Sequence, residues 1–312
     1  MIKDQIICPI CDSKNVRFEA PYRNNHSCFQ NLNRTSCLDC DLHFSHPMPS
    51  KGKLKIYNES FHSEAYGGKE RDKKQSAFFS GMAKTRMNFI LQNFNPRHKE
   101  RLKVLEVGPG SGTFLKEWKA VFSDVDYFVI ESDRSCHKEL EILGATLVSE
   151  ESILDYKEKF DLLIMSHVLE HIPEPYIFMK NILSAFSKNA FIFIDVPCTD
   201  WKFKSLDESH LLFFDKKPMK LLLNKLNLKT IKISYFGMTI KRINNQFFSF
   251  LRRLRGYLWR NYGFKYYHPK RKVLRKKLGN LWETEALLRF DAHEEKSEPS
   301  WWIMVLAKKQ QL

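Results

Sequence analysis

Short apolar runs alternate with amphipathic stretches between residues 103 and 240 of this chain. The runs have the length of buried strands, and the stretches between them carry apolar residues at helical spacing. This alternation predicts an α/β fold of the Rossmann-like type, in which helical crossovers cover a largely parallel sheet. The predicted strands are residues 103–107, 126–130, 146–148, 162–166, 190–196 and 230–236.

The remaining chain divides by the same pattern. Residues 1–50 contain short β-like pieces between cysteines, and residues 51–102 form a connector. The connector should end in a helix over residues 75–94, because Asn95 precedes a proline and is disfavoured in a helix. Residues 241–299 are basic, aromatic and helical in spacing, which predicts a helical insertion or lid. Residues 300–312 hold a last strand, 301–307, that completes the domain begun at residue 103.

Four cysteines near the N-terminus form two Cys-x-x-Cys pairs, Cys8 with Cys11 and Cys37 with Cys40. Two intervening residues allow a tight turn to aim both sulfurs at one ion, and two such turns complete a tetrahedral site that zinc favours. We therefore expect a zinc ribbon over residues 1–50. The zinc should be structural, since four thiolates leave no open position for a substrate. Unligated thiols or a redox pair are the alternative.

Three alternating glycines, Gly108, Gly110 and Gly112, follow the first strand of the α/β region and precede a helix. Glycines there allow the backbone to turn sharply and a ligand to lie against the main chain. The next strand ends in Glu131, a carboxylate that can accept both hydroxyls of a ribose. A nucleotide-bearing cofactor is expected at this loop, with a purely structural turn as the alternative.

Three segments in this order resemble the class I S-adenosylmethionine (SAM)-dependent methyltransferases. The first reads Val-Leu-Glu-Val-Gly-Pro-Gly-Ser-Gly over residues 104–112, the second ends at Glu131, and the third is the Phe-Asp…Val-Leu-Glu-His-Ile-Pro-Glu-Pro stretch over residues 160–175. The resemblance implies SAM as cofactor and an antiparallel pairing of strands 230–236 and 301–307 at one edge of the sheet. It also implies a set of cofactor contacts: Glu106, Gly108, Gly110, Gly112, Phe114, Glu131, Ser166, His167 and Tyr66. Tyr57 is a second connector tyrosine of this kind, although packing explains either tyrosine equally well.

The cysteine pairs, followed by His-Pro-Met-Pro-Ser over residues 46–50, resemble bacterial methyltransferases that carry an N-terminal zinc ribbon. Several of those act on sugars or surface-polysaccharide precursors. That resemblance covers roughly residues 1–240 and the last strand, and it leaves residues 241–299 without a match.

Residues with chemistry should follow the fourth and fifth strands, where open α/β sheets bind ligands. His171 lies in the Leu-Glu-His turn, and a structural role in that turn is its alternative. Histidine has an intrinsic pKa near neutrality, and His210 is the main candidate for a catalytic or substrate-binding role, oriented by Glu208. Helix capping or packing is the alternative for His210. Cys198 ends an Asp-Val-Pro-Cys stretch similar to that of RNA cytosine methyltransferases, but it follows the fifth strand where theirs follows the fourth, so we do not expect it to be a nucleophile.

The formal net charge of +15 comes from one segment. Residues 216–282 contain 19 Lys and Arg and no Asp or Glu, whereas the rest of the chain holds 32 basic and 36 acidic residues. Such a segment should face an acidic partner. The open possibilities are a solvated lid, a surface for a phosphate-bearing glycan substrate or an acidic membrane, and an RNA-binding surface.

No apolar run approaches the roughly 18–20 residues that span a bilayer, and the N-terminus lacks the apolar core of a signal peptide. We therefore expect a cytoplasmic protein, with peripheral contact at the inner face of the membrane. The leading hypothesis is a SAM-dependent methyltransferase acting on a small molecule or glycan, with a nucleotide- or lipid-linked sugar favoured. The alternatives are an RNA methyltransferase and a SAM- and zinc-binding protein without catalysis.

Overall fold

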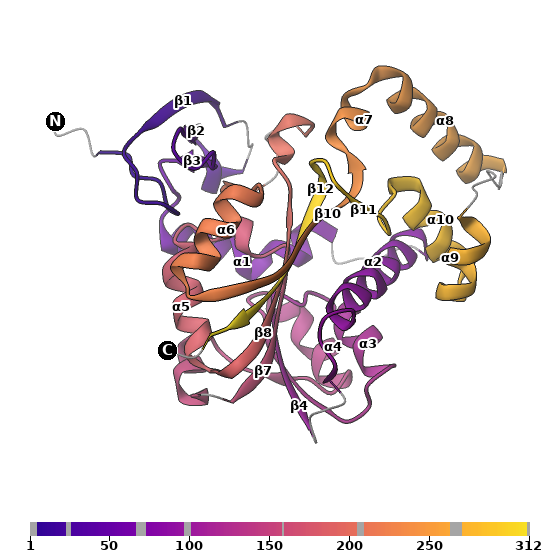
Figure 1. The fold of residues 1–312 in the computed structure, drawn as a ribbon, viewed down its shortest axis with the longest axis horizontal. Helices are drawn as coiled ribbons and strands as arrows, with labels where there is room; N and C mark the ends of the chain where they lie inside the picture. The colour runs from indigo at the N-terminus through magenta and orange to yellow at the C-terminus, as the bar shows by residue number, and fades with distance from the viewer. Residues whose placement is uncertain are drawn as a thin grey trace.

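The computed structural model describes residues 5–22, 26–66, 73–96, 101–157, 159–204, 209–262 and 270–310. An eight-stranded sheet forms its centre, in the order β11-β10-β12-β8-β7-β4-β5-β6 (Figure 1). These strands are β4 (Leu102–Val107), β5 (Val125–Ile130), β6 (Thr146–Leu147), β7 (Phe160–Ser166), β8 (Phe186–Pro197), β10 (Leu228–Thr239), β11 (Glu295–Lys296) and β12 (Ser300–Lys309). Each predicted strand lies on one of them, so the expected Rossmann-like α/β fold is confirmed.

The sheet is parallel from β6 to β8 and antiparallel at its other edge. β12 pairs antiparallel with both β8 and β10, and β10 pairs antiparallel with β11. The antiparallel pairing of the last two predicted strands is therefore confirmed. β12 lies between β8 and β10, so the last strand in sequence is an inner strand of the sheet.

Successive residues of β4 point to opposite faces of the sheet and into two hydrophobic cores. Leu105 belongs to the core that includes side chains of α5 (Pro175–Ser184) and α6 (Lys216–Lys225). Val104 belongs to the core on the other face, with α2 (Lys73–Leu91) and α3 (Thr113–Lys119). Both faces are apolar because helices cover both, as is usual for parallel sheets. The crossover between β5 and β6 contains α4 (His137–Ile142).

Helix α2 ends at Leu91, three residues before the predicted end. The amides of Asn93 and Phe94 both donate to the carbonyl of Ile90, at 3.1 and 3.0 Å, so a tight turn closes the helix before the Asn-Pro pair is reached. The Asn95-Pro96 pair therefore predicted the region in which the helix ends, but not its last residue.

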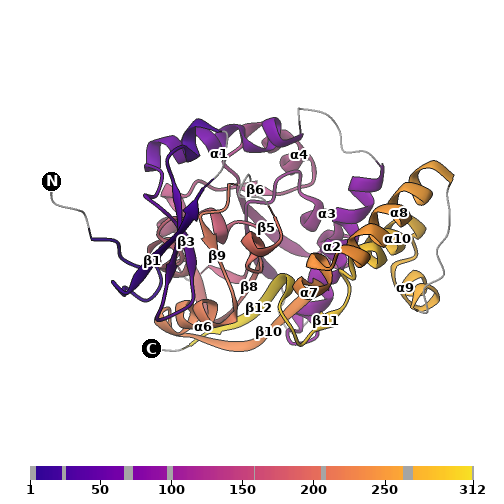
Figure 2. The same cartoon turned by 90° about the horizontal axis from the view of Figure 1, so that it is seen from above.

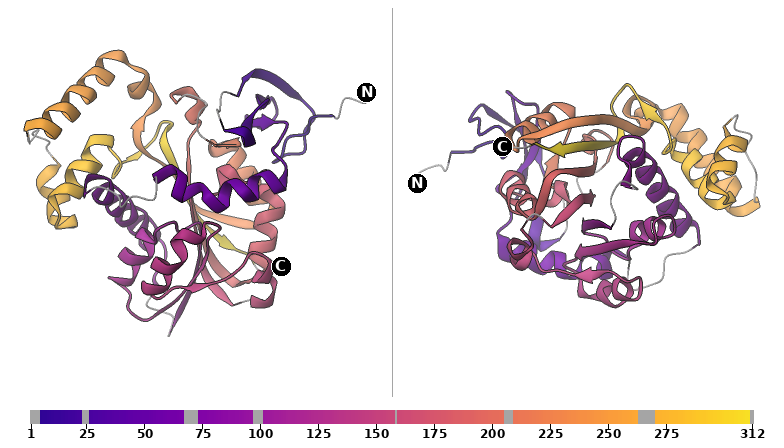
Figure 3. Two further views of the ribbon diagram at one scale, coloured as in Figure 1. Left: turned by 180° about the vertical axis from the view of Figure 1, so that it is seen from behind. Right: turned by 60° about the horizontal axis from the view of Figure 1, so that its bottom comes forward.

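A second sheet joins the N-terminal module to the α/β domain. Its order is β1-β2-β3-β9, with β1 (Val16–Pro21), β2 (Asn33–Cys37) and β3 (His43–His46) from the module. The fourth strand, β9 (Leu212–Phe213), follows His210 and pairs antiparallel with β3. Helix α1 (Lys51–Tyr66) follows this module and lies on the side of the molecule that Figure 3 shows from behind. The module is therefore built into the domain and shares one apolar core with it.

Helices α7 (Ile240–Asn244), α8 (Gln246–Tyr262), α9 (Arg271–Leu278) and α10 (Leu281–Phe290) form an arm opposite the N-terminal module (Figures 1 and 2). Helix α10 packs on α2 and α9. Lys84 of α2 pairs with Glu283 at 2.8 Å, which fixes α10 to the domain. Among the described residues, no helix is long and apolar enough to cross a membrane.

Candidate functional site

The glycine-rich loop leaves β4 in a conformation that requires glycine. Gly108 has a φ of 67°, and a Cβ added there would lie 2.6 Å from Cγ2 of Val168. Its amide donates to the carbonyl of Ile130 at 2.8 Å, which holds the loop against the end of β5. Gly110 and Gly112 also have positive φ values, 55° and 71°. The main chain is therefore exposed at a place where a side chain does not fit.

Glu131 is fixed by the same loop. Its Oε2 accepts from the amide of Gly110 at 2.8 Å, and its Oε1 accepts from the amide of Asp133 at 2.9 Å. Burial raises the pKa of this carboxyl above its ordinary value, against the two amide hydrogen bonds. Each oxygen keeps a further lone pair, so the carboxylate can accept two ribose hydroxyls as the sequence predicts.

Glu106 supports the loop from within the sheet. It is fully buried on β4, and its Oε2 accepts from the hydroxyl of Tyr127 on β5 at 2.7 Å. Burial raises its pKa to about 7, partly opposed by the Tyr127 hydrogen bond and the nearby Arg86. At neutral pH this carboxyl is therefore close to half protonated.

The other predicted cofactor residues lie in different surroundings. Phe114 is buried in the core, with its ring 5.7 Å from that of Trp118. Ser166 ends β7, and its buried hydroxyl makes no hydrogen bond to any described residue. Tyr66 ends α1, and its side chain lies outside the described residues. Tyr57, on the same helix, packs its ring edge-on to Phe29 at 4.9 Å between centroids, in favour of the packing interpretation.

His167 stands directly after β7 with a φ of 56°. Its Nδ1 lies 3.3 Å from Oε1 of Glu170, and its Nε2 lies 3.8 Å from Oδ2 of Asp195 at the end of β8. Nε of Arg86, from α2, contacts the same Asp195 oxygen at 2.6 Å. A buried ion pair thus lies beside His167, a predicted cofactor contact, whose imidazole lies between two carboxylates.

A cluster of two histidines and two carboxylates lies next to this pair. His171 belongs to the turn η5 (Leu169–His171), and its ring centre lies 5.0 Å from that of His210. Nδ1 of His210 lies 2.7 Å from Oδ2 of Asp200, on the turn η6 (Asp200–Lys202). Oε1 of Glu170 lies 3.9 Å from Nε2 of His171 and 4.0 Å from Nε2 of His210. The two histidines singled out in the sequence are therefore brought together.

The electrostatics of this cluster favour a neutral His171 and two ionised carboxylates, Glu170 and Asp200. Burial lowers the pKa of His171 to about 4, so this imidazole is neutral at physiological pH. The pKa of Glu170 is lowered to about 2, because its surrounding histidines outweigh its burial. The pKa of Asp200 is lowered by the same balance, with His210 as the main favourable partner. Both carboxylates are ionised at neutral pH.

Comparison with known proteins identifies the domain that carries these residues. A family profile described as a methyltransferase domain matches residues 80–268, more than half of the chain. This chain belongs to the methyltransferase-domain family. No match to a curated protein was found.

Solved structures of methyltransferases are similar to this chain. A SAM-dependent methyltransferase from Thermotoga maritima is 13% identical over 82% of this chain and 100% of its own, with a TM-score of 0.50. A SAM-dependent methyltransferase from Archaeoglobus fulgidus is 18% identical over 74% of this chain and 94% of its own, with a TM-score of 0.47. The plantazolicin methyltransferase BpumL in complex with SAH is 15% identical over 83% and 97%, with a TM-score of 0.47. At 13% identity the likeness to the Thermotoga maritima protein concerns the fold alone.

Three residues of this methyltransferase were missed by sequence reasoning. Asp200 is the carboxylate that contacts His210, whereas the predicted partner Glu208 lies outside the described residues. Arg86 comes from the connector, where no motif marks it. Glu170 was visible in the Leu-Glu-His turn, yet its place between the histidines was not apparent.

The N-terminal module holds the His210 segment through backbone contacts. The hydroxyl of Tyr22 donates to the carbonyl of His210 at 3.0 Å. The amide of Ser45 donates to the carbonyl of Leu211 at 2.8 Å, and the amide of Leu211 donates to the carbonyl of Glu170 at 2.8 Å. The position of His210 in this methyltransferase therefore depends on the module as well as on the Rossmann-like domain.

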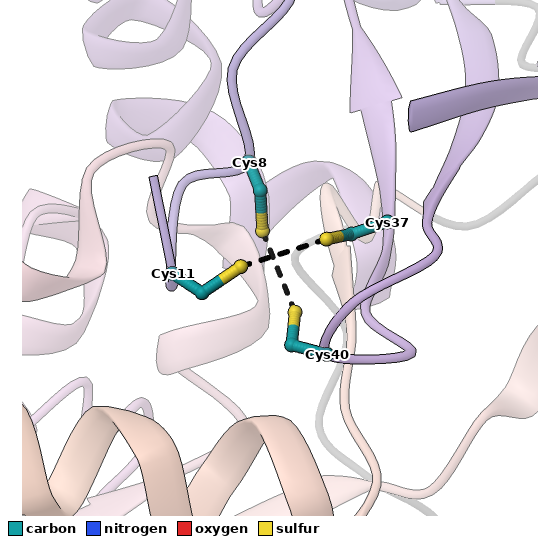
Figure 4. Close-up of side chains that lie close together, drawn as sticks. All are labelled: Cys8, Cys11, Cys37 and Cys40. Atoms are coloured by element: carbon teal, nitrogen blue, oxygen red, sulfur yellow. Dashed lines mark hydrogen bonds between the residues drawn. The ribbon is translucent and has the colours of Figure 1, made fainter. Parts of the chain in front are cut away.

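The four cysteines of the module converge on one point (Figure 4). The sulfurs of Cys8 and Cys40 are 3.6 Å apart and those of Cys11 and Cys37 are 3.5 Å apart, which is too long for disulfides. A tetrahedral zinc site with bonds of about 2.3 Å places its sulfurs about 3.8 Å apart. The four thiols thus have nearly the spacing that such an ion requires, and contact with Cys40 lowers the pKa of Cys8 to about 5.

Cys198 has the surroundings of a structural cysteine. It is fully buried after β8, and burial raises its pKa to about 12. A thiol in this environment is protonated at physiological pH and is a poor nucleophile.

Proposed function

We propose that this methyltransferase transfers the methyl group of SAM to a hydroxyl of a small-molecule or glycan acceptor, with a nucleotide- or lipid-linked sugar as the favoured class. The observation that supports this most is the juxtaposition at the carboxyl ends of β4, β5, β7 and β8. A glycine loop with a held carboxylate stands there beside a buried His–Asp pair, so that a cofactor site adjoins an acid–base site.

The loop residues fit SAM. The main chain of Gly108, Gly110 and Gly112 would lie against the cofactor, and Glu131 would accept its ribose hydroxyls. When bound, SAM supplies an activated methyl group on a sulfonium. The protein then has to align the acceptor with that methyl group and receive the acceptor's proton.

His210 would receive that proton. Its contact with Asp200 assigns the proton to Nδ1 and makes Nε2 the basic nitrogen. Asp200 also stabilises the imidazolium that forms, as a buried carboxylate does behind a catalytic histidine. His171 donates from Nδ1 to the carbonyl of Ser209 at 3.0 Å, and so braces the chain on which His210 sits.

The cysteine cluster is proposed to hold a structural Zn²⁺. Its spacing fits a tetrahedral site, and three of its four sulfur-bearing residues, Cys8, Cys37 and Cys40, are buried. Metal binding would add to the folding free energy that the module gains from the core it shares with the α/β domain.

The arm is proposed to contact an acidic membrane surface, which would bring the enzyme to a lipid-linked acceptor. Helix α8 exposes large apolar side chains, with Phe247 at 64% and Phe250 at 61% exposure. It lies in the segment that has basic residues and no acidic ones. Apolar side chains beside a basic surface are typical of helices that lie in the interface of anionic bilayers.

The deciding experiment measures SAM binding by calorimetry and methyl transfer to a panel of nucleotide- and lipid-linked sugars. We expect micromolar SAM binding by the wild type and by His210→Asn, because His210 lies outside the glycine loop. Methyl transfer should fall at least about 100-fold in His210→Asn and stay unchanged in His46→Asn, a control histidine outside the site. Absence of SAM binding would refute the function. If the protein methylates RNA but no sugar, the proposed acceptor class is wrong and the acceptor is RNA.

A further inference from the structure

The carboxylate of Glu170 is buried and faces imidazole rings. Its exposure is 1%, and its Oε1 lies 3.3, 3.9 and 4.0 Å from ring nitrogens of His167, His171 and His210. The contact with His167 stabilises the ionised carboxyl, whereas His171 and His210 lie too far away for hydrogen bonds to it. Burial of an ion is costly, so a further cation beside this oxygen would be stabilising.

The two imidazoles of His171 and His210 are oriented by partners on their far side. Nδ1 of His171 donates to the backbone carbonyl of Ser209, and Nδ1 of His210 faces the carboxylate of Asp200. Both rings therefore present Nε2 to Glu170. Histidines that ligate metals are held in this way, with the second nitrogen donating to a carbonyl or a carboxylate.

We propose that Glu170, His171 and His210 bind a divalent transition-metal ion. One oxygen and two imidazole nitrogens within 4.8 Å of one another form the two-histidine, one-carboxylate set that Zn²⁺, Mn²⁺, Fe²⁺ or Co²⁺ accept. Three protein ligands leave at least one position for water or for an oxygen of the acceptor.

The geometry needs little adjustment. Metal bonds of about 2.0–2.2 Å place neighbouring ligand atoms roughly 3–3.5 Å apart. The separations of 3.9 and 4.0 Å in the cluster would close with side-chain shifts of about half an ångström. The backbone of the two histidine segments is already joined, since Leu211 donates to the carbonyl of Glu170.

This inference rests on the proposed function for its role, because the ion would stand where the acceptor binds. An acceptor hydroxyl bound to the ion would have a lowered pKa and could release its proton to solvent water, so that no protein base is needed. In the metal-bound form His210 would be a ligand through Nε2, and it would serve as the base only where the ion is absent. The site differs in chemistry from the four cysteines, since its oxygen and nitrogen ligands suit harder ions than thiolates do.

Mn²⁺ is the probe that separates the two sites, because thiolates bind it poorly. The full-length protein is dialysed briefly against EDTA, its zinc content is measured before and after, and Mn²⁺ is titrated with electron paramagnetic resonance as readout. The test variants are His171→Asn, His210→Asn and Glu170→Gln. Asparagine keeps a donor near the position of Nδ1 but removes Nε2, so the bracing hydrogen bonds to Ser209 and Asp200 can persist.

We expect one Mn²⁺ per wild-type chain, displaced by added Zn²⁺, and an affinity at least about tenfold weaker in each variant. Controls are His46→Asn and Glu174→Gln, an exposed carboxylate four residues from Glu170, and both should bind as the wild type does. If the wild type binds no Mn²⁺, or if all three folded variants bind it as tightly, the site does not exist. Should a histidine variant fail to fold, Glu170→Gln, which keeps the side-chain shape, carries the same test.

The failure of this site and the failure of the proposed function are distinguishable in the same samples. SAM binding by calorimetry depends on the glycine loop and needs no ion, whereas Mn²⁺ binding needs no SAM. SAM binding with no Mn²⁺ site would leave His210 as the base. Mn²⁺ binding without SAM binding would keep the metal site and remove its role in methyl transfer.

Discussion

Replacing Glu106 by glutamine should remove a pH-dependent cost from the centre of the sheet. Glu106 is fully buried, and its pKa is raised from 4.5 to about 7. Glutamine has nearly the same shape, and its carbonyl oxygen can accept the hydrogen bond that Tyr127 donates to Glu106. The substitution therefore changes the ionisation of this position and leaves its packing largely intact.

The sign follows from the direction of the pKa shift. Because the folded chain holds this proton more tightly than the unfolded chain, the wild type loses stability as the pH rises from about 4.5 to about 7. Each pKa unit corresponds to about 1.36 kcal/mol, so a shift of about 2.5 units amounts to about 3 kcal/mol. The glutamine variant lacks this cost. Relative to the wild type, Glu106→Gln should gain about 3 kcal/mol between about pH 4 and about pH 8.

Urea denaturation of both proteins at several pH values measures this difference. The other titrating groups, including the cysteine cluster, are shared and cancel when the two unfolding free energies are subtracted. Most of the change should fall between about pH 5 and about pH 7. A difference that stays constant across this range would show that Glu106 ionises normally in the folded protein, and the reasoning from burial would be wrong.

Three further predictions address the other parts of the molecule. Gly108→Ala should weaken SAM binding by at least about tenfold in calorimetry, because its Cβ would contact Val168 and the left-handed backbone costs about 1–2 kcal/mol. The control Gly52→Ala has open space at its Cβ and should bind SAM as the wild type does. Mass spectrometry of the metal content should find one zinc fewer per chain in Cys37→Ser than in the wild type, together with a loss of several kcal/mol of stability; an unchanged zinc content in this variant would exclude the cysteine site. The double variant Phe247→Ser/Phe250→Ser should bind phosphatidylserine vesicles at least about tenfold more weakly in a sedimentation assay. Phe18→Ser, at 59% exposure on the opposite module, is the matched control, and an equal loss there would rule out a specific role of α8.

The strands of the central sheet could be predicted because burial on both faces gives each one an apolar run with few interruptions. The antiparallel edge was implied by the resemblance to class I methyltransferases, in which the last strand pairs with the strand before the insertion. Strand β9 could not, because Leu212–Phe213 has only two residues and no alternation to recognise. Its pairing with β3 is a tertiary contact that the sequence pattern of neither segment indicates.

The candidate site shows the same division. The glycine loop and Glu131 follow from local sequence, because a turn and a strand end fix their positions. The contact of His210 with Asp200 does not, since Asp200 is ten residues away and lies on a short 3₁₀ turn. The predicted partner Glu208 lies outside the described residues and stays a prediction. Asp200 could have been found by giving equal weight to every carboxylate after the fifth strand. Arg86 carried no signal, because its role depends on how α2 packs against β8.

The β3–β9 pairing changes what the cysteine module does for this enzyme. Tyr22 and Ser45 of the module bond to the carbonyls of His210 and Leu211, and Leu211 in turn bonds to Glu170. Other contacts join the module to α6, such as those of Asp41 with Lys217 and of Asp12 with Lys225. The hydrogen bonds of Gly108 and Gly110 run to Ile130 and Glu131. Loss of order in the module should therefore release the acceptor side of the site while the cofactor side stays formed. An enzyme in which the module is loosened would still bind SAM but would hold its acceptor poorly. On this view the ribbon is a wall of the acceptor site, which explains why it is joined to the domain by a shared sheet.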